Sequence, residues 1–408
     1  MSTEIHLDWQ GEPHLVGRLF VADRGTTASF EYDASWLRRA DAFAIDPTGL
    51  PLQRSAHHAP VLFGAIQDTG PDRWGHLLIE RAVRRKLLVR QPWRALDFVL
   101  ALDDTSRIGA LRFRETVAGP FLATGSGRLP PLVRLASLLQ AADAIHRESE
   151  TAADLRFLLA EGSPLGGARP KSAVLLEDGT LGIAKFPKPD DTHELAAGEI
   201  LALTLARGAG ITVADHRRVA VAGRGVALIR RFDRVGDIRI PFVSAATLLG
   251  LSAGETATYT GIADGIRRFG DQVPADLSEL WRRMVFSLLI SNFDDHARNH
   301  GFLMHRPGCW ALSPAYDLNP VPETERASVM QTAISEDDDR VSIEAALAAA
   351  GRFSLKPAAA RGILSEVVQG VSRWRETGRT LRLKATTLDA YASAFEQPCL
   401  AEARRLMK

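Results

Sequence analysis

One short segment pairs an aspartate with an asparagine at a spacing that suits phosphoryl transfer. Asp294 and Asn299 stand five positions apart within residues 291–300 (SNFDDHARNH). Phosphoryl transfer needs a group that orients or deprotonates the attacking hydroxyl, and metal ions that bridge the phosphates. Protein kinases place an aspartate and an asparagine five positions apart in one loop for those two tasks. The spacing indicates a phosphotransferase with Asp294 as its catalytic aspartate.

A second carboxylate could complete a metal site. Asp317 follows two short apolar runs, residues 301–304 and 309–312, which flank a turn at 306–308 and are typical of a hairpin. Two oxygen ligands together with phosphate and water suit Mg²⁺, which is rarely held in an all-protein cage. We therefore expect Asn299 and Asp317 to bind magnesium beside ATP.

Upstream, one lysine stands in an apolar, strand-like run. Lys185 lies within residues 182–186 (GIAKF). Such a lysine often extends its amine to solvent along an apolar surface. The helical segment that follows offers Glu194 and Glu199, either of which could hold Lys185 toward the nucleotide phosphates, as a lysine–glutamate pair does in kinases. We predict that Glu199 is the ion-pair partner of Lys185.

A glycine-rich stretch precedes this strand. Gly166, Gly167 and Ala168 could let backbone N–H groups approach a phosphate, while Arg169 and Lys171 add positive charge. Gly-Gly pairs are usually plain turns. The stretch is therefore informative only in order with the lysine, the catalytic aspartate and the metal ligands downstream.

A metal hydrolase is a different interpretation of the same region. His296 and His300 stand four apart, as in a zinc-binding helix pair, but Ala297 follows the first histidine where a glutamate base would be needed. A site assembled from His296, Asp295 and the pair His57-His58 is conceivable.

Two blander interpretations also stay open. Asp294 and Asp295 could be a solvated pair of loop carboxylates. Ser163 could be a nucleophile, but no Gly-x-Ser-x-Gly elbow surrounds it, and its structural role would be that of a cap.

A β-rich first half and a helical second half must position these residues. The clearest helix is 277–290, whose apolar residues recur at i, i+3, i+4 and i+7, with Asp276 as its predicted cap. We predict an α+β fold with two lobes, like a protein kinase, in three domains: 1–125, 126–232 and 233–408. The expected strands are 15–20, 27–32, 172–176, 181–186 and two within 219–231. The expected helical segments are 64–88, with helical spacing after a turn at 68–72, and 132–147, 152–160, 194–206, 277–290, 343–350 and 356–374.

Composition excludes several classes of protein. The 408 residues are 46% hydrophobic and 24% charged with a net charge of +1, so no overall field favours nucleic acid or a membrane surface. The two cysteines, Cys309 and Cys399, stand far apart, which suits a reducing compartment. Apolar runs such as 284–290 are too short to cross a bilayer, and the first residues do not resemble a signal peptide. We expect a cytoplasmic protein.

These strings together resemble the HipA family, serine/threonine kinases that act as toxins of bacterial toxin–antitoxin pairs. The resemblance covers nearly the whole chain and is more specific than any one string. It rests on GGARPK at 166–171, KFP at 185–187, RFDR at 231–234, NFDDHARN at 292–299 and PAYDL at 314–318, with LVGRL at 15–19 and residues 62–81 similar to the family's N-terminal subdomain.

The resemblance implies a role for each matching position. Asp294 would be the catalytic aspartate, Asn299 and Asp317 the Mg²⁺ ligands, and Lys185 a phosphate contact. His296 and Tyr316 would line the ATP site. Residues 230–232 would form the hinge whose backbone meets adenine, so Arg230 and Phe232 are counted as ATP-binding positions.

Ser163 occupies the position that family members autophosphorylate. A phosphate there would place about −1.5 to −2 charge where the ATP phosphates should sit. We therefore expect the modification to expel the loop and to switch the kinase off.

The resemblance also implies partners. They are a small helix-turn-helix antitoxin similar to HipB, operator DNA only through that antitoxin, and a protein substrate such as an aminoacyl-tRNA synthetase. A small-molecule kinase of the antibiotic type, and a catalytically idle partner of the antitoxin on DNA, are the alternatives.

Overall fold

The structure, a computed structural model, describes residues 2–22, 27–88, 93–115, 119–122, 131–160, 169–252, 254–327, 329–338 and 340–407. The chain forms two units. The first comprises residues 1–191, 219–243 and 303–308, and the second comprises residues 192–218, 244–302 and 309–408. This division does not test the three domain boundaries expected from the sequence, which stay a prediction.

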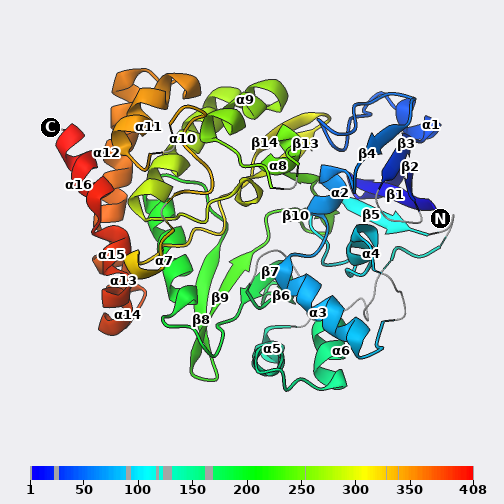
Figure 1. Ribbon diagram of the computed structural model, residues 1–408, viewed down its shortest axis with the longest axis horizontal. Coiled ribbons are helices and arrows are strands. Elements are labelled where there is room, and N and C mark those ends of the chain that lie inside the picture. Colours follow the sequence, from blue (N-terminus) through cyan, green and yellow to red (C-terminus); the bar gives the residue numbers. More distant parts are fainter. Residues whose placement is uncertain are drawn as a thin grey trace. The chain divides into compact units, whose positions relative to one another are not determined.

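The first unit begins with a five-stranded antiparallel sheet in the order β4-β3-β2-β1-β5 (Figure 1). Gln10 and Gly11 both have positive φ where β1 turns into β2, as a two-residue hairpin with the twist of its strands requires. The expected strand at 15–20 falls within β2, and the one at 27–32 matches β3 except for its first residue. The bounds are β1 Ser2–Trp9, β2 Glu12–Val21, β3 Ala28–Tyr32, β4 His57–Ala59 and β5 Leu111–Arg114, with α1 Ala34–Leu37 and α4 Ala95–Leu100 beside them.

The turn expected at 68–72 divides the helical segment 64–88 into two helices. α2 spans Gly64–Asp68 and α3 spans Arg73–Arg84. Pro71 disfavours helical backbone at the residue before it, so the chain leaves the helix there. Asp72 then begins α3 by accepting a hydrogen bond from the Gly75 N–H at 2.9 Å.

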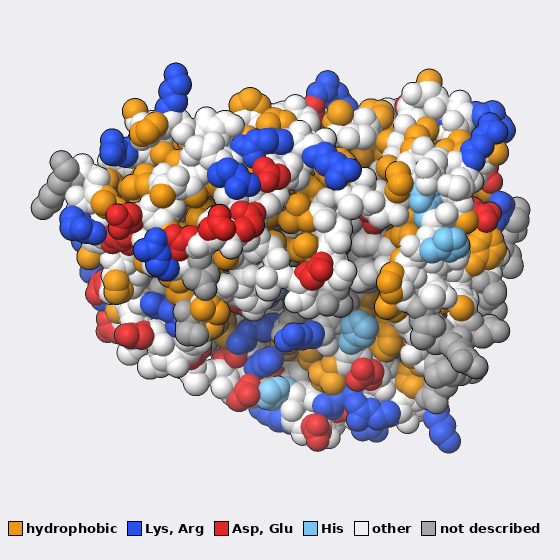
Figure 2. Space-filling view, turned by 45° about the horizontal axis from the view of Figure 1, so that its top comes forward, with side chains coloured by type: hydrophobic (Ala, Val, Ile, Leu, Met, Phe, Trp, Pro, Cys, Tyr) orange, Lys and Arg blue, Asp and Glu red, His pale blue; other side chains and the backbone are white. Residues whose placement is uncertain are grey.

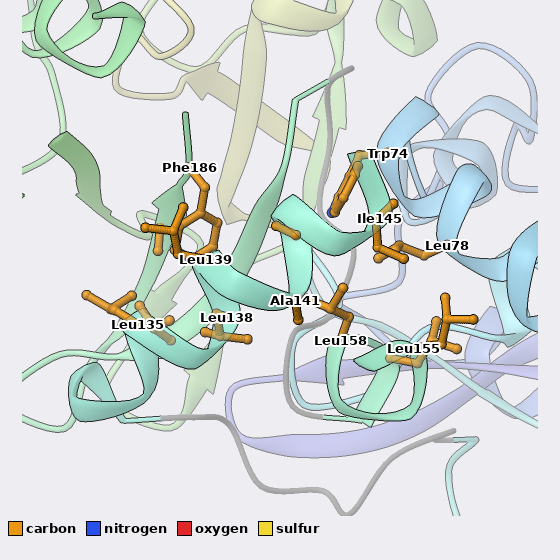
Figure 3. Packing of buried hydrophobic residues seen from close by; sticks show 14 of the residues in the cluster. Trp74, Leu78, Leu135, Leu138, Leu139, Ala141, Ile145, Leu155, Leu158 and Phe186 are labelled. Carbon is orange, nitrogen blue, oxygen red and sulfur yellow. The ribbon is translucent and has the colours of Figure 1, made fainter. Parts of the chain in front are cut away.

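A second sheet, in the order β6-β7-β9-β8, packs against helices of the first unit. The hairpin expected at 177–180 is confirmed, with Gly179 at φ +77°. Buried side chains of α3, α5 and α6 gather with Phe186, which follows β7 (Figure 3). This core supports the two strands that carry the predicted nucleotide residues. The bounds are α5 Leu135–His146, α6 Ala152–Ala160, β6 Lys171–Leu175, β7 Leu181–Lys185, β8 His216–Val221 and β9 Arg224–Arg230.

The second unit is mostly helical. α10 (Val273–Leu289) confirms the expected helix at 277–290, and its apolar stripe is buried. Its start differs from the prediction. Gln272 occupies the N-cap position without a capping hydrogen bond from its side chain, and Asp276 lies inside the first turn, where it accepts a hydrogen bond from the Leu312 N–H at 3.2 Å. The other helices are α7 Leu195–Gly208, α8 Ala245–Leu249, α9 Tyr259–Phe269, α11 Ile343–Ala349, α12 Pro357–Ser372, α13 Trp374–Thr380, α14 Ala385–Ala390, α15 Ala392–Phe395 and α16 Pro398–Leu406.

Short strands complete the described chain. β12 (Phe242–Ser244), β13 (Gly301–Arg306) and β14 (Cys309–Leu312) form a three-stranded sheet, which confirms the expected hairpin before Asp317. Gly308 has φ +73° in its turn. β10 (Arg234–Val235) and β11 (Ile238–Arg239) form a two-stranded ribbon in the first unit.

Charges of both signs are interspersed on the face shown in Figure 2, as the net charge of +1 leads one to expect. Within the described ranges, no helix combines the length and apolar character needed to cross a membrane.

Candidate active site

The catalytic segment begins where α10 stops. Ser291 has φ +57°, and the Asn292 N–H donates to the Ser287 carbonyl at 2.9 Å, so the helix ends in a left-handed turn. The Ser291 hydroxyl donates to the Ala394 carbonyl at 3.0 Å. The turn redirects residues 292–300 away from the helix axis and fixes where the segment starts.

Asp294 and Asn299 are brought together as the spacing predicts. Asn299 closes a single 3₁₀ turn, Ala297–Asn299, and its side-chain Nδ2 donates to the backbone carbonyl of Asp294 at 3.1 Å. The Asp294 side chain is exposed, whereas Asn299 is buried. The carboxylate of Asp294 can therefore meet a substrate hydroxyl while Asn299 is held behind it.

Gln331 is a contact of Asp294 that the sequence did not predict. Its Nε2 donates to Asp294 Oδ1 at 2.5 Å, and its backbone N–H donates to the Phe293 carbonyl at 3.1 Å. Gln331 stands 37 positions further along the chain in an irregular segment. Neither motif nor periodicity marks it, so no sequence signal could have found it.

Asp317 lies on a segment bonded to the catalytic segment on both sides. The Tyr316 hydroxyl donates to the Arg298 carbonyl at 2.7 Å, and the Asn319 N–H donates to Asn292 Oδ1 at 3.3 Å. Asp317 itself has φ +57°, an uncommon conformation for a residue with a side chain. The second unit thus assembles Asp294, Asn299, Tyr316 and Asp317 in one place.

The donor set fits magnesium. The Nδ2 of Asn299 is engaged by the Asp294 carbonyl, so its amide oxygen is the atom that a metal ion would meet. Asp317 supplies a carboxylate, and Mg²⁺ commonly binds one or two such oxygens together with phosphates. In the parts of the chain that the structure describes, no group of three or more His, Cys, Asp or Glu side chains could hold a metal ion alone.

Asp295, the neighbour of the catalytic aspartate, has a role that the sequence did not reveal. It is 3% exposed and accepts hydrogen bonds from the Tyr259 hydroxyl and, at 3.2 Å, from the Ser287 hydroxyl. The interpretation of Asp294 and Asp295 as a solvated carboxylate pair is therefore wrong for Asp295. Of the two histidines of that segment weighed for a metal, His296 is half-buried and His300 is buried.

In the first unit, two lysines face each other across a strand pair. Lys171 of β6 and Lys185 of β7 are directly paired, so their side chains project from one face of the sheet. Lys171 is 5% exposed, and its Nζ lies 3.8 Å from Asp72 Oδ2. The structure thus places the two predicted phosphate-binding lysines side by side, with a carboxylate next to one of them.

The remaining glycine-rich stretch is only partly described. Arg169 forms an ion pair with Asp191 at 2.7 Å. The other four predicted positions, Ser163, Gly166, Gly167 and Ala168, lie outside the described residues.

The two glutamates weighed as partners of Lys185 differ in their surroundings. Glu194 pairs with Arg218 at 2.5 Å and accepts a hydrogen bond from the Thr387 hydroxyl at 3.2 Å. Glu199 is buried on α7 at 4% exposure. Because the Glu194 carboxylate has these partners inside the second unit, Glu199 stays the candidate.

At the predicted hinge, the side chain of Arg230 is held by the β6–β7 turn. Its guanidinium pairs with Asp178 at 2.7 Å and donates to the Thr180 hydroxyl. The Arg231 N–H donates to the Leu181 carbonyl at 2.9 Å, which fixes the backbone beside Phe232. Any adenine contact at Arg230 would therefore use its backbone, as expected of a hinge.

A buried carboxylate anchors the chain after the hinge. Asp233 is 1% exposed, pairs with Arg231 and Arg234 at 2.5 and 2.6 Å, and accepts the Gly109 N–H at 2.7 Å. Burial alone would raise the pKa of Asp233, but the two guanidinium groups hold that pKa well below its usual range. Arg231 also donates to the Ser106 carbonyl at 2.5 Å. The RFDR string is therefore an ion network within the first unit.

Comparison with known families gives two matches. The family model described as the HipA-like C-terminal domain matches residues 163–374, and the one described as the HipA N-terminal domain matches residues 9–114. The first match alone covers more than half of the chain.

Three curated relatives carry kinase names. "Putative kinase Y4mE" of Sinorhizobium fredii is 27% identical over 346 residues, 76% of this chain and 75% of that protein. "Putative kinase Y4dM" of the same organism is 30% identical over 190 residues, 42% of this chain and 44% of that protein. A "Putative kinase" of Haemophilus influenzae is 24% identical over 195 residues, 42% of this chain. The alignments span 44% and 57% of the length of the last two relatives.

Among solved structures, the chain is similar to HipA of Shewanella oneidensis, determined with HipB and its operator DNA. The TM-score is 0.70 at 18% identity, and the match covers 99% of this chain and 97% of that one. At this identity the match shows the fold alone, and it confirms the expected α+β, kinase-like fold.

Proposed function

Because the chain belongs to the HipA family, we propose that it is a protein serine/threonine kinase that uses ATP and Mg²⁺ and acts as the toxin of a toxin–antitoxin pair. One observation carries the proposal. Hydrogen bonds hold Asn299 to Asp294 and join the residues on either side of Asp317 to the same segment of the second unit, which supports a site with one catalytic aspartate and two oxygen ligands.

The residues divide the reaction between them. Asp294 orients the attacking hydroxyl and takes its proton as the new O–P bond forms and the bond to the leaving ADP oxygen breaks. Asn299 and Asp317 would hold Mg²⁺, which when bound neutralises charge on the phosphates. Lys185 and Lys171 supply positive charge for the phosphates, and residues 230–232 would meet the adenine.

The partners follow from the family. We propose a helix-turn-helix antitoxin similar to HipB, contact with DNA only through that antitoxin, and a translation-related substrate such as an aminoacyl-tRNA synthetase. The Shewanella relative was solved with HipB and operator DNA, which supports the first two. Autophosphorylation of Ser163, as an off-switch, and a cytoplasmic location complete the proposal.

Labelled ATP tests the activity. The full chain is incubated with γ-labelled ATP and Mg²⁺, alone and with a cell extract. Asp294→Asn should lower phosphate incorporation by about 10²–10⁴-fold, the usual contribution of general-base catalysis. Asp389→Asn is the matched control, because Asp389 is exposed and pairs only with a surface arginine in the described contacts, Arg375 at 3.2 Å.

The outcomes separate the alternatives. If the wild type labels neither itself nor any extract protein and consumes no ATP, the chain is an idle antitoxin partner and the kinase proposal is wrong. Labelling of small molecules alone would indicate a small-molecule kinase. Full self-labelling by Ser163→Ala would place the autophosphorylation site elsewhere.

A further inference from the structure

A second pair of residues repeats the spacing of the catalytic pair one position later. Asp295 and His300 stand five apart, as Asp294 and Asn299 do, so each directly follows one member of the catalytic pair. Their exposure is opposite to that of Asp294: Asp295 and His300 are each 3% exposed, whereas Asp294 is exposed. The segment therefore has a buried side and a side that faces the reaction.

The buried pair is in mutual contact. His300 Nε2 lies 3.1 Å from Asp295 Oδ1. The Tyr259 ring packs edge-on against the His300 ring, with centroids 5.4 Å apart. This contact closes the loop of residues 295–300 through its own side chains, so the two ends of the catalytic segment cannot separate without breaking it.

Two helices fasten the same carboxylate. Tyr259 at the start of α9 and Ser287 in α10 donate to Asp295 Oδ2, and they are 0% and 1% exposed. The Tyr259 backbone N–H donates to the Ala333 carbonyl at 2.9 Å, two positions beyond Gln331. The loop is thus tied to the helical core and to the segment that contacts Asp294.

The chemistry of the pocket keeps the carboxylate charged. Burial would raise the pKa of Asp295, but His300 and the hydroxyl donors hold that pKa below its usual range. A buried charge persists only where hydrogen-bond partners compensate its lost hydration. Loss of the charge would weaken the hydrogen bonds that the Tyr259 and Ser287 hydroxyls donate, because a neutral oxygen is a poorer acceptor than a carboxylate.

We propose that Asp295 and His300 are positioning residues that clamp both ends of the catalytic segment, so that Asp294 and Asn299 keep their separation and orientation toward the nucleotide. The inference rests on the proposed kinase function. It adds an inner pair, held by α9 and α10, to the outer pair that meets the substrate and metal.

Three variants test the clamp. Asp295→Asn removes the charge with little change of shape, and His300→Leu removes the other end. Both should lower kcat about 10–100-fold, because a displacement of about 1 Å at a reacting group costs on that order. KM for ATP should change less than about threefold, since the lysines of the first unit are untouched. His300→Gln restores an N–H donor and should recover most of kcat.

A buried carboxylate of α10, the helix that carries Ser287, provides the control. Asp276 of α10 is 8% exposed and accepts the Leu312 N–H at 3.2 Å, which an amide oxygen can also accept. Asp276→Asn should leave kcat unchanged. If Asp295→Asn stays within twofold of the wild type in kcat, or if Asp276→Asn loses as much, the positioning role is wrong.

The rate of amide hydrogen exchange tests the clamp independently of catalysis. The Asn299 N–H donates to the His296 carbonyl at 2.8 Å and the Gln331 N–H to the Phe293 carbonyl at 3.1 Å. Both amides should exchange at least tenfold faster in Asp295→Asn and at the wild-type rate in Asp276→Asn. Faster exchange in a chain that proves inactive would reject the kinase proposal and keep the clamp. Unchanged exchange with unchanged kcat would reject the clamp alone.

Discussion

At the scale of single residues, the proposed catalytic aspartate, Asp294, is hydrogen-bonded by a side chain from a distant part of the sequence. Gln331 donates to one oxygen of Asp294, a hydrogen bond between a neutral donor and a charged acceptor. Bonds of this kind contribute about 1.5–3 kcal/mol, enough to select one orientation of an exposed carboxylate. The orientation of Asp294 therefore depends on a residue that takes no part in phosphoryl transfer.

Gln331→Ala should lower kcat by roughly 3–10-fold, because the carboxylate then rotates among orientations of which only some suit the hydroxyl. Gln331→Glu should lower kcat further, because its negatively charged carboxylate repels the Asp294 carboxylate and cannot donate the hydrogen bond. Steady-state rates of phosphate transfer measure both. A rise in kcat for Gln331→Ala would mean that Gln331 occupies the place of the substrate hydroxyl instead of orienting its base.

At the scale of elements, one carboxylate both caps a helix and lies beside a lysine of a neighbouring strand, a lysine that we propose binds phosphate. Asp72 begins α3 with its Oδ1, and its Oδ2 faces Lys171 of β6 at 3.8 Å. The side chains of Asp72 and Lys171 are 10% and 5% exposed. Breaking a buried pair leaves a charge with poor hydration. The helix that follows Pro71 is thereby coupled to β6, one of the strands that carry the proposed nucleotide-binding lysines.

Asp72→Asn should reduce the free energy of unfolding by about 1–3 kcal/mol, because asparagine still caps α3 but no longer neutralises Lys171. Added ADP supplies the missing negative charge, so it should raise the Tm of Asp72→Asn more than that of the wild type. Thermal unfolding with and without ADP gives both values. Asp178→Asn, which alters an exposed partner of Arg230, serves as the control. Equal effects of the two variants would contradict the coupling.

At the scale of the whole chain, the first unit joins residues from two distant stretches of the sequence, 1–191 and 219–243. The Asp233 network links the chain after the hinge to the loop around Ser106 and Gly109. Arg107, 0% exposed, extends the network by donating to the carbonyls of Val99 and Leu102 at 2.9 Å. The N-terminal sheet region is thus bonded to the hinge through buried charge.

This network predicts an acid-sensitive contribution to stability. The pKa of Asp233 is lower in the folded chain than its ordinary value, so its stabilisation is complete above about pH 4 and is lost as the pH falls through the lowered pKa. Asp233→Asn should therefore be destabilised by about 3–5 kcal/mol at pH 7 and by progressively less below pH 4. Urea unfolding at a series of pH values measures the difference.

Asp276 provides the opposite sign in the same experiment. Burial raises the pKa of Asp276 in the folded chain, so the charged carboxylate costs more free energy in the folded chain than in the unfolded chain. Asp276→Asn should therefore be neutral or stabilising at pH 7, with a difference in the free energy of unfolding that vanishes in acid.

A pH-independent loss of stability in Asp233→Asn would contradict the ion-network interpretation.

Local patterns in the sequence account for much of the fold and for part of the site. The periodicity of 277–290 predicted α10, and the turn residues at 177–180 and 306–308 predicted two hairpins, because dihedral preferences and side-chain spacing act between near neighbours. The five-residue spacing of Asp294 and Asn299 was informative for the same reason. The turn at 68–72 was recognised from its residues, whereas the N-cap at Gln272 was missed, because its side chain makes no capping hydrogen bond and the sequence offered Asp276 instead.

No local pattern in the sequence predicted the long-range contacts. Gln331 beside Asp294, Asp72 beside Lys171, and Tyr259 with Ser287 around Asp295 each join residues that are distant in sequence or that look like ordinary polar positions. Whether a carboxylate becomes a surface charge or a buried clamp depends on which helices pack over it, and packing is settled by the folded core. Residue type and spacing therefore led to the chemistry proposed for this chain, while its three-dimensional packing determined which side chains surround the residues proposed to carry it.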